Sequence, residues 1–422
     1  MQARMAKRHR AERRFRRAGF IAILSAVIAL AILLVSVLAN GLGAFRSSEI
    51  RLDVAFSQDA FGSLAGLGEE ERDAAIARAD YGALVRDALR ARFPDVEGRR
   101  AVRALQALAS VGARSDLRSM VRADPSRIGR SASLWLPADD EVARFRAGEI
   151  SKHVPESERR LSDRQIGWIE ALEADGDLRS AFNTRFLVSG DSREPELAGV
   201  WGAAVGSFWT LAITLVLSFP VGAAAALYLE EFAPKSRWTD WIEININNLA
   251  AVPSIVFGLL GLALFLNFLG LPRSAPLVGG MVLALMTLPT VIIAGRAAIR
   301  SVPPSIREAA LAVGASPLQV ALQHVLPLAL PGVLTGTIIG MARALGETAP
   351  LLMIGMVAFI VDIPAGVTDP ATVLPVQIFL WADAPERAFL AKTSAAILVL
   401  LGFLVSMNLS AVLLRNRFER RW

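Results

Sequence analysis

Long apolar runs divide this chain of 422 residues into a membrane part and a polar part. A bilayer span needs about 20 consecutive apolar residues, and five stretches without a charged residue reach that length. A sixth apolar stretch, 328–361, is interrupted only by Arg343 and Glu347. We therefore expect six transmembrane helices. The five uncharged stretches lie between Arg17 and Arg46, Glu196 and Glu230, Glu243 and Arg273, Arg273 and Arg296, and Lys392 and Arg415.

The first apolar stretch allows two interpretations. A secretory signal peptide has an apolar core of about 7–15 residues, whereas the apolar core here covers residues 19–39. Its length favours an uncleaved transmembrane helix at 18–42 over a signal peptide. A basic tail at 1–17 then precedes the first span, and a short tail at 415–422 follows the last.

The polar part, residues 43–198, is long enough to enclose a hydrophobic core of its own. Apolar side chains alternate over 50–56, as they do in a half-buried strand, and Trp135 lies in a second extended stretch. Helical periodicity covers 69–93 and recurs from Val102 to Ala109. A further helix is expected from Ser162, where Gln165 completes a capping box. The sequence therefore predicts an inserted α+β domain.

Charge gives this arrangement an orientation. Residues 1–17 contain eight basic residues and one acidic residue, 415–422 contain four and one, and 43–198 contain 24 and 27. Because short segments rich in Lys and Arg stay in the cytoplasm, both termini are expected inside and 43–198 outside. A basic tail can also bind nucleic acid, but its position against a span favours a topology signal. Arg296 and Arg300, at the inner end of the fourth span, are expected to anchor it at the interface.

The chain offers little for catalysis. It has no cysteine, and His153 is the only histidine of residues 43–198, which leaves no thiol nucleophile and no multi-histidine metal site there. None of the four lysines lies in a G-x-x-x-x-G-K-[ST] loop that would hold ATP. We therefore expect a protein that is not an enzyme, with no catalytic residues, no metal and no cofactor of its own.

The predicted cytoplasmic loop, 301–327, carries the signals of two short helices joined by a turn. Ser305 and Glu308 have the spacing of a capping box that would start the first helix. Gly314 suits the left-handed position that ends it. Ile306, Ala310 and Val313 are expected on one face of this helix.

The second helix of the loop is expected to begin at Ser316 and Pro317, which suit the N-cap and first helical positions, and to end at Pro327. Its predicted apolar face comprises Leu318, Leu322 and Val325. Such a hairpin is either a capped structure at the interface without a partner or a docking element for a soluble protein.

From Glu308 to Pro327 the sequence resembles the EAA loop of type I ABC importer permeases, through the spacing E-A-A-x3-G and the final Leu-Pro. In that family the loop enters a cleft of the ATPase subunit. This chain has His324 where the family usually has an apolar residue, and Val325 is expected to supply the packing. The resemblance implies six residues that couple to the ATPase: Glu308, Ala309, Ala310, Gly314, Leu326 and Pro327.

Two further segments, Val-Pro-Ser-Ile-Val-Phe-Gly at 252–258 and Gly-Glu-Thr-Ala-Pro at 346–350, resemble the phosphate-specific PstA and PstC permeases, and the PstA type more closely. The resemblance covers about half of the chain. It implies an all-α permease domain at 199–414 that contains five of the six transmembrane helices and the coupling loop. The domain at 43–198 resembles an insertion found after the first span in a subset of these permeases.

This resemblance implies one half of the translocation path of an ATP-driven phosphate importer in a bacterial inner membrane. Its implied partners are a second permease of the PstC type, an ATPase dimer of the PstB type that uses ATP and Mg, and a periplasmic phosphate-binding protein of the PstS type. Membrane lipid is a partner, and nucleic acid is not. Two alternatives remain: a permease for another anion or small polar solute, and a membrane-anchored ligand sensor. Kinked spans and a hairpin favour transport.

Arg343 and Glu347 are the unusual feature of the membrane region. A charge at the centre of a membrane helix costs roughly 2.5–3.5 kcal/mol on insertion scales, and residues four apart share one helix face. One interpretation is an ion pair that stabilises a helix kinked near Pro350. The other is that Arg343 faces the substrate, because its planar fork suits an oxyanion. The predicted substrate pathway comprises Arg343, Glu347, Thr348 and Ser254.

Overall fold

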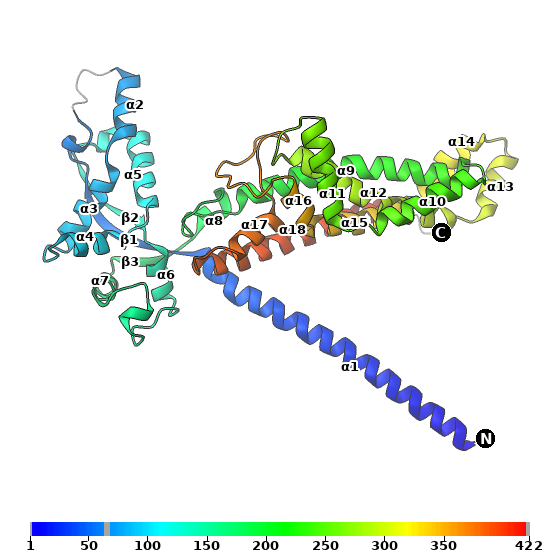
Figure 1. Ribbon diagram of the computed structural model, residues 1–422, viewed down its shortest axis with the longest axis horizontal. Coiled ribbons are helices and arrows are strands. Elements are labelled where there is room, and N and C mark those ends of the chain that lie inside the picture. Colours follow the sequence, from blue (N-terminus) through cyan, green and yellow to red (C-terminus); the bar gives the residue numbers. More distant parts are fainter. Residues whose placement is uncertain (1, 63–67, 419–422) are drawn as a thin grey trace.

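The computed structural model describes residues 2–62 and 68–418 and has two parts, a bundle of long helices and a smaller domain at one end of it (Figure 1). Within the described residues, five helices are long and apolar enough to cross a membrane, and a bent pair makes a sixth. These match the six predicted spans. The bundle comprises α1 (Gln2–Gly41), α9 (Trp201–Leu227), α10 (Arg237–Ala250), α11 (Ser254–Gly261), α12 (Pro276–Arg300), α13 (Pro304–Ala312), α14 (Pro317–Gln319), α15 (Leu326–Gly346), α16 (Ala349–Met353), α17 (Leu374–Ala382) and α18 (Ala388–Phe418).

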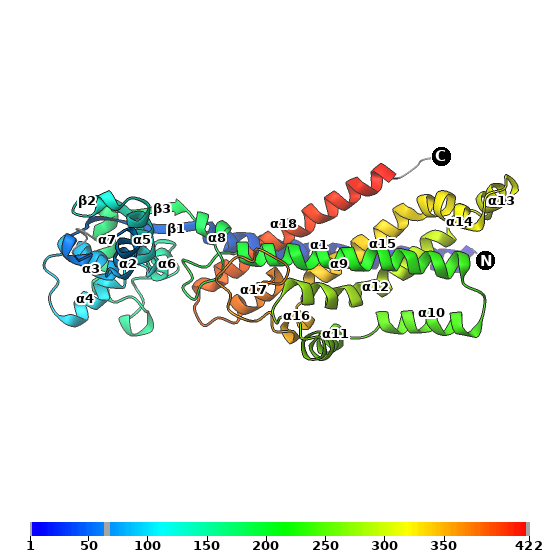
Figure 2. The ribbon, with the colours of Figure 1, turned by 90° about the horizontal axis from the view of Figure 1, so that it is seen from above.

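The predicted third span is the bent pair, α10 and α11, whose axes differ by 99° (Figure 2). The break lies at Pro253, which has an extended backbone (ψ 136°) and precedes the first residue of α11. Proline has no N–H to donate to a helix and disfavours helical geometry at the residue before it. The proline thus explains why an apolar stretch long enough to span forms two helices at a steep angle.

Helix α12 is the centre of the bundle, in contact with α9, α10, α11 and α15. Glycine makes the closest approaches possible. A Cβ atom at Gly280 would lie 2.6 Å from the Cβ of Ile213 on α9, and one at Gly336 of α15 would lie 2.1 Å from the Cβ of Ala294. Small residues at such contacts let membrane helices approach closely and pack tightly.

The smaller domain is built on a three-stranded antiparallel sheet in the order β2-β1-β3. Ile50, Leu52 and Val54 of the central strand are fully buried in the domain core. The alternation predicted over 50–56 is therefore confirmed, as is the strand around Trp135. The strands are β1 (Arg46–Ala55), β2 (Ser131–Pro137) and β3 (Leu178–Phe182), and the helices are α2 (Glu69–Arg78), α3 (Tyr81–Arg92), α4 (Arg99–Gln106), α5 (Gly112–Ala123), α6 (Asp140–Arg146), α7 (Asp163–Ala174) and α8 (Thr184–Val188).

Local capping decides where the helices of this domain begin. Ser162 and Gln165 form the predicted capping box at the start of α7. The single helix expected over 69–93 is wrong, because the chain breaks before Asp80, whose carboxylate caps α3 by accepting from the N–H of Ala83 at 3.0 Å. A helix extending to Ala109 is also wrong, since α4 ends at Gln106.

The hairpin formed by α13 and α14 lies at the end of the bundle opposite the sheet domain, and the start of α1 and the end of α18 point toward that same end (Figures 1 and 2). Helix α1 is helical from Gln2, so the basic tail continues the first span without a break. The C-terminal end of α1 contacts α18 closely: a Cβ at Gly41 would lie 3.1 Å from the backbone N of Ala395. The rest of α1 points away from the bundle (Figure 1). Six spans, an even number, agree with this arrangement of α1 and α18.

Candidate functional site

The hairpin at the end of the bundle has most of the predicted turn chemistry. Helix α13 ends before Gly314, whose φ of +91° is a conformation that glycine adopts without a steric penalty. Ser316 caps α14 in a capping box with Gln319, and Pro317 occupies the first turn. The turn is thus fixed by local hydrogen bonds and one glycine.

Two predictions about the ends of the hairpin are wrong. Ser305 does not cap α13, because Pro303 is the N-cap and no side chain caps the helix; two successive prolines, Pro303 and Pro304, start the helix two residues earlier than predicted. Pro327 does not end the second helix. The chain continues from α14 through a π-helical segment (Val320–Val325) into α15, where Pro327 lies in the first turn, a position that needs no N–H donor.

The predicted coupling residues divide into an exposed tip and a buried base. Glu308, Ala309 and Gly314 are exposed at the tip, Ala310 is buried, and Leu326 and Pro327 are half-buried at the start of α15. Val325 is fully buried beside the exposed His324, and so supplies the packing expected of it.

The apolar residues of the hairpin are also divided between base and tip. Val313, expected on the buried face, is 85% exposed because it lies at the helix end. Leu318 and Leu322, also expected to line the second helix, are exposed as well, as is Leu311. The tip therefore presents several apolar side chains that nothing in the described chain covers.

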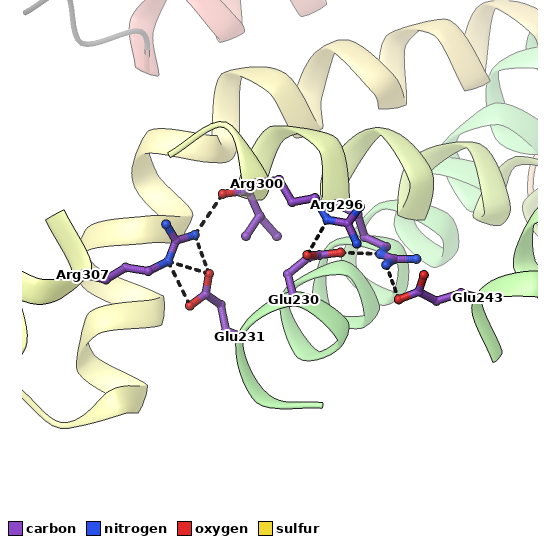
Figure 3. Close-up of polar contacts among 7 residues, drawn as sticks. Glu230, Glu231, Glu243, Arg296, Arg300 and Arg307 are labelled. Carbon is purple, nitrogen blue, oxygen red and sulfur yellow. Dashed lines mark hydrogen bonds and ion pairs between the residues drawn. The ribbon is translucent and has the colours of Figure 1, made fainter. Parts of the chain in front are cut away.

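An ion pair connects α13 to the π-helical turn, Tyr228–Phe232, that continues α9 at its end (Figure 3). The Arg307 guanidinium donates to both carboxylate oxygens of Glu231, with the shortest contact, Nη2 to Oε1, at 2.7 Å. It also donates to the carbonyl oxygen of Ile299, in the last turn of α12, at 3.0 Å and to that of Val302, just after the helix, at 2.7 Å. One side chain therefore holds the hairpin, the end of α9 and the end of α12 together.

A second group of charges lies beside it (Figure 3). Glu230 accepts from Arg296 and, at 2.7 Å, from Arg300, and Arg296 also donates to Glu243 of α10. Arg296 is nearly fully buried, so the expectation that it anchors the helix at a lipid interface is wrong; Arg300, which is exposed, fits that expectation. A sequence signal could have predicted this group of charges. The second and fourth spans carry opposite charges at their inner ends, Glu230 and Glu231 on one and Arg296 and Arg300 on the other.

The structure brings the two permease-like segments together. Gly258 of α11 packs on Pro350 of α16 so closely that a Cβ at Gly258 would lie 2.6 Å from the Cα of Pro350. Ser254 begins α11 and Thr348 immediately precedes α16, and both side chains are half-buried. Two helix breaks, one in the third span and one in the fifth, therefore lie side by side.

Arg343 and Glu347 lie at the second of these breaks. The helix ends at Gly346, and Glu347 has an extended backbone, so only Arg343 is helical. The Nε atom of Arg343 lies 3.5 Å from Oε1 of Glu347; the arginine side chain is 51% exposed and the glutamate side chain 19% exposed. The predicted pair exists, but it is a single long contact that leaves most of the guanidinium donors open.

Cavities and metal-binding groups add little at this end of the molecule. A cavity of about 770 Å³ lies at the base of the hairpin, lined by Ile306, Pro327, Pro331 and Arg415 among others. In the described ranges, no group of three or more Asp, Glu or His side chains is arranged to hold a metal ion. The site is therefore a mechanical and electrostatic arrangement.

Comparison with known proteins shows the family to which this bundle belongs. The chain belongs to the family of binding-protein-dependent transport system inner membrane components, whose profile matches residues 218–422. It is thus a non-catalytic, multi-pass subunit of an ABC transporter. A second profile, a domain of unknown function (DUF3333), matches residues 2–156, which include α1 and most of the sheet domain.

The similar curated proteins indicate the PstA type within this family. The chain is 32% identical to phosphate transport system permease protein PstA 1 of Mycobacterium tuberculosis (strain H37Rv) over 223 residues, which are 53% of this chain and 71% of that protein. It is 30% identical to the probable ABC transporter permease protein YqgI of Bacillus subtilis over 52% of this chain and 80% of that one. A solved structure of the MetNI methionine ABC transporter has 18% identity and a TM-score of 0.41, covering 52% of this chain and 98% of that chain.

Proposed function

We propose that this permease imports inorganic phosphate and forms one half of the path, together with a second permease of the PstC type. An ATPase dimer of the PstB type supplies the energy from ATP and Mg, and a binding protein of the PstS type delivers the substrate. The names of the PstA relatives support this assignment. The observation that carries it is Arg343, a half-exposed guanidinium at a helix break inside the membrane region.

The geometry at Arg343 suits an oxyanion. Arginine presents five N–H donors in a planar fork, and its bonds to phosphate are charge-assisted and often bidentate. Glu347 engages only Nε, at 3.5 Å, so the remaining donors are free to bind substrate. The negative charge of the Glu347 carboxylate also repels a bound phosphate, which favours its release from Arg343. Arg343 thus binds the anion transiently, while Glu347, Thr348 and Ser254 line the path of the anion through the membrane.

Coupling follows from the ion pairs beneath the hairpin. The exposed apolar tip of the hairpin docks in the ATPase, and Arg307 connects the hairpin to α9 and α12. When the ATPase subunits close on ATP, the hairpin moves, and the ends of both helices move with it. The helix breaks at Pro253 and Glu347 then change the access to Arg343, as expected for alternating access.

The orientation is part of this proposal. Basic residues concentrate in 1–17 and 415–422, and the start of α1 and the end of α18 point toward the same end of the molecule as the hairpin (Figure 2). By the positive-inside rule the hairpin is cytoplasmic, where the ATPase is, and the sheet domain is periplasmic. The sheet domain is then on the side from which the binding protein approaches.

Radiolabelled phosphate uptake tests the proposal. A strain without its own phosphate importer should take up phosphate only when this chain is expressed together with its permease and ATPase partners. Arg343→Gln should reduce uptake at least 100-fold at an unchanged membrane level, because the anion loses its charged donor. Arg273→Gln, in the exposed loop before α12, is the matched control and should keep normal uptake. Normal uptake by the Arg343 variant, or uptake of another solute without phosphate, would refute the assignment.

A further inference from the structure

A large cavity lies where the sheet domain meets the bundle. Its volume is about 1120 Å³, and its walls come from the last turn of α1, the start of β1, helix α6, the segment from β3 to α8 and the first turns of α18. None of these elements belongs to the hairpin or the helix breaks. The residues on which its chemistry depends are Asn40, Leu42, Arg46, Arg387, Leu390 and Lys392.

Two helices place this cavity at the surface of the bilayer. The apolar core of α1, residues 19–39, spans about 30 Å at 1.5 Å per residue, the thickness of the hydrocarbon layer. The uncharged part of α18, residues 393–414, is about as long. Asn40 follows the apolar run of α1, and Lys392 precedes that of α18. Gly41 packs against Ser394 and Ala395, so both apolar runs end at the same height along the bundle. The cavity therefore opens at the depth of lipid headgroups.

The charges on the cavity wall are unequally paired. Six basic and four acidic residues line it. Three of the arginines already have carboxylate partners, namely Arg144, Arg146 and Arg185. Among the residues that the structure describes, no carboxylate lies within the 4.0 Å ion-pair distance of Arg46, Arg387 or Lys392, and Glu196 acts on Lys392 only from farther away. Three positive charges therefore remain for an anion.

The acidic residues on the wall are fewer than the basic ones, and half of them are in ion pairs. Glu49 pairs with Arg179 and Glu149 with Arg144. Glu196 accepts a hydrogen bond from Ser110, and burial raises the pKa of its carboxyl group above the usual range. Burial likewise raises the pKa of Asp140. Among the described residues of the wall, three basic side chains and two carboxyl groups, Asp140 and Glu196, are thus outside ion pairs, so the unpaired charge is positive even with both carboxyl groups ionised.

The burial of Lys392 is the strongest indication that the cavity binds an anion. The residue is only 5% exposed, and its ammonium group lies 4.8 Å from the centre of the Phe186 ring. Its one hydrogen bond is to the carbonyl oxygen of Ala198 at 3.2 Å, although an ammonium group has three donors. A buried charge is costly unless it is paired. An anion in the cavity would satisfy the two remaining donors.

The rim of the cavity is apolar. Leu42 and Leu390 line it and are exposed, next to Arg46 and Arg387, which are also exposed. A free ion makes no favourable contact with apolar side chains, whereas a phospholipid can place its phosphate among the cations and its acyl chains against the leucines. We propose that the cavity binds the phosphate group of an anionic phospholipid from the leaflet that faces the sheet domain.

Native mass spectrometry of the full-length chain in mild detergent, titrated with phosphatidylglycerol, tests this site. The wild-type chain should retain one tightly bound lipid. The double variant Arg46→Gln and Arg387→Gln should bind it about 30-fold more weakly, the effect of two lost basic contacts at a membrane surface. Arg90→Gln, which removes an exposed arginine of α3 away from the cavity, is the matched control.

Two results would overturn the proposal. One is equal retention of phosphatidylglycerol by the double variant and the wild-type chain. The other is binding of inorganic phosphate to the delipidated chain with the same dependence on Arg46 and Arg387, which would identify the ligand as free phosphate. Failure of inorganic phosphate to compete with the lipid would support the lipid site. None of these outcomes depends on which solute the permease transports.

Discussion

The ion pair between Arg307 and Glu231 allows a sharp test of how the hairpin is held. Replacing Arg307 by glutamine removes the bidentate contact to Glu231 and the bonds to the carbonyl oxygens of Ile299 and Val302. The side chains of the pair are only 24% and 13% exposed, so solvent replaces little of what is lost. Removing one partner of a buried pair costs about 3–5 kcal/mol. We expect the free energy of unfolding to fall by about 3 kcal/mol.

A double-mutant cycle separates the pair from its surroundings. Glu231→Gln should cost less than Arg307→Gln, because Arg307 keeps its two carbonyl partners. The double variant should cost about 1–3 kcal/mol less than the sum of the single variants. Arg300→Gln is the matched control, since its side chain is 62% exposed and makes one contact, with Glu230; exposed pairs contribute about 1 kcal/mol or less.

The assay is denaturant unfolding of the purified chain in mixed micelles, followed by tryptophan fluorescence. Additive effects of the two single variants would show that the pair contributes nothing specific. A cost for Arg300→Gln as large as that for Arg307→Gln would show that burial does not decide the effect. Either result would refute the reasoning. In the assembled transporter, Arg307→Gln should also leave ATP hydrolysis active while reducing uptake.

Three further predictions follow from single positions. Gly258→Ala should abolish transport, because its Cβ would lie 2.6 Å from the Cα of Pro350, whereas Gly402→Ala, with open space around it, should transport normally. Gly314→Asp should keep ATP hydrolysis and lose uptake, and Gly314→Ala, which has the same backbone strain without the charge, separates strain from docking. Burial raises the pKa of Asp139 to about 7, so the native state binds a proton that the unfolded state releases. Thermal stability should therefore fall between about pH 4 and pH 7, and Asp139→Asn should flatten this dependence.

The sequence predicted the features that depend on neighbouring residues. Apolar runs indicated the spans, alternation indicated β1, and Ser162 and Ser316 marked helix starts, because a cap bonds to a backbone N–H three residues away. Gly314 marked the hairpin turn for the same local reason. Where two local signals compete, the sequence was a weaker guide: Ser305 has the spacing of a cap, but the prolines before it begin the helix.

Only the tertiary structure decided which distant residues meet. Arg307 and Glu231 are 76 positions apart, and Gly258 of α11 meets Pro350 of α16 although α12, α13, α14 and α15 lie between them in the chain. Nothing in the pattern of either segment specifies the other, because each contact requires the helices to be packed first. For the same reason the sequence did not predict the role of Lys392, which is one polar residue beside a span. Folding buries its ammonium group over the Phe186 ring and places the residue in the wall of a cavity.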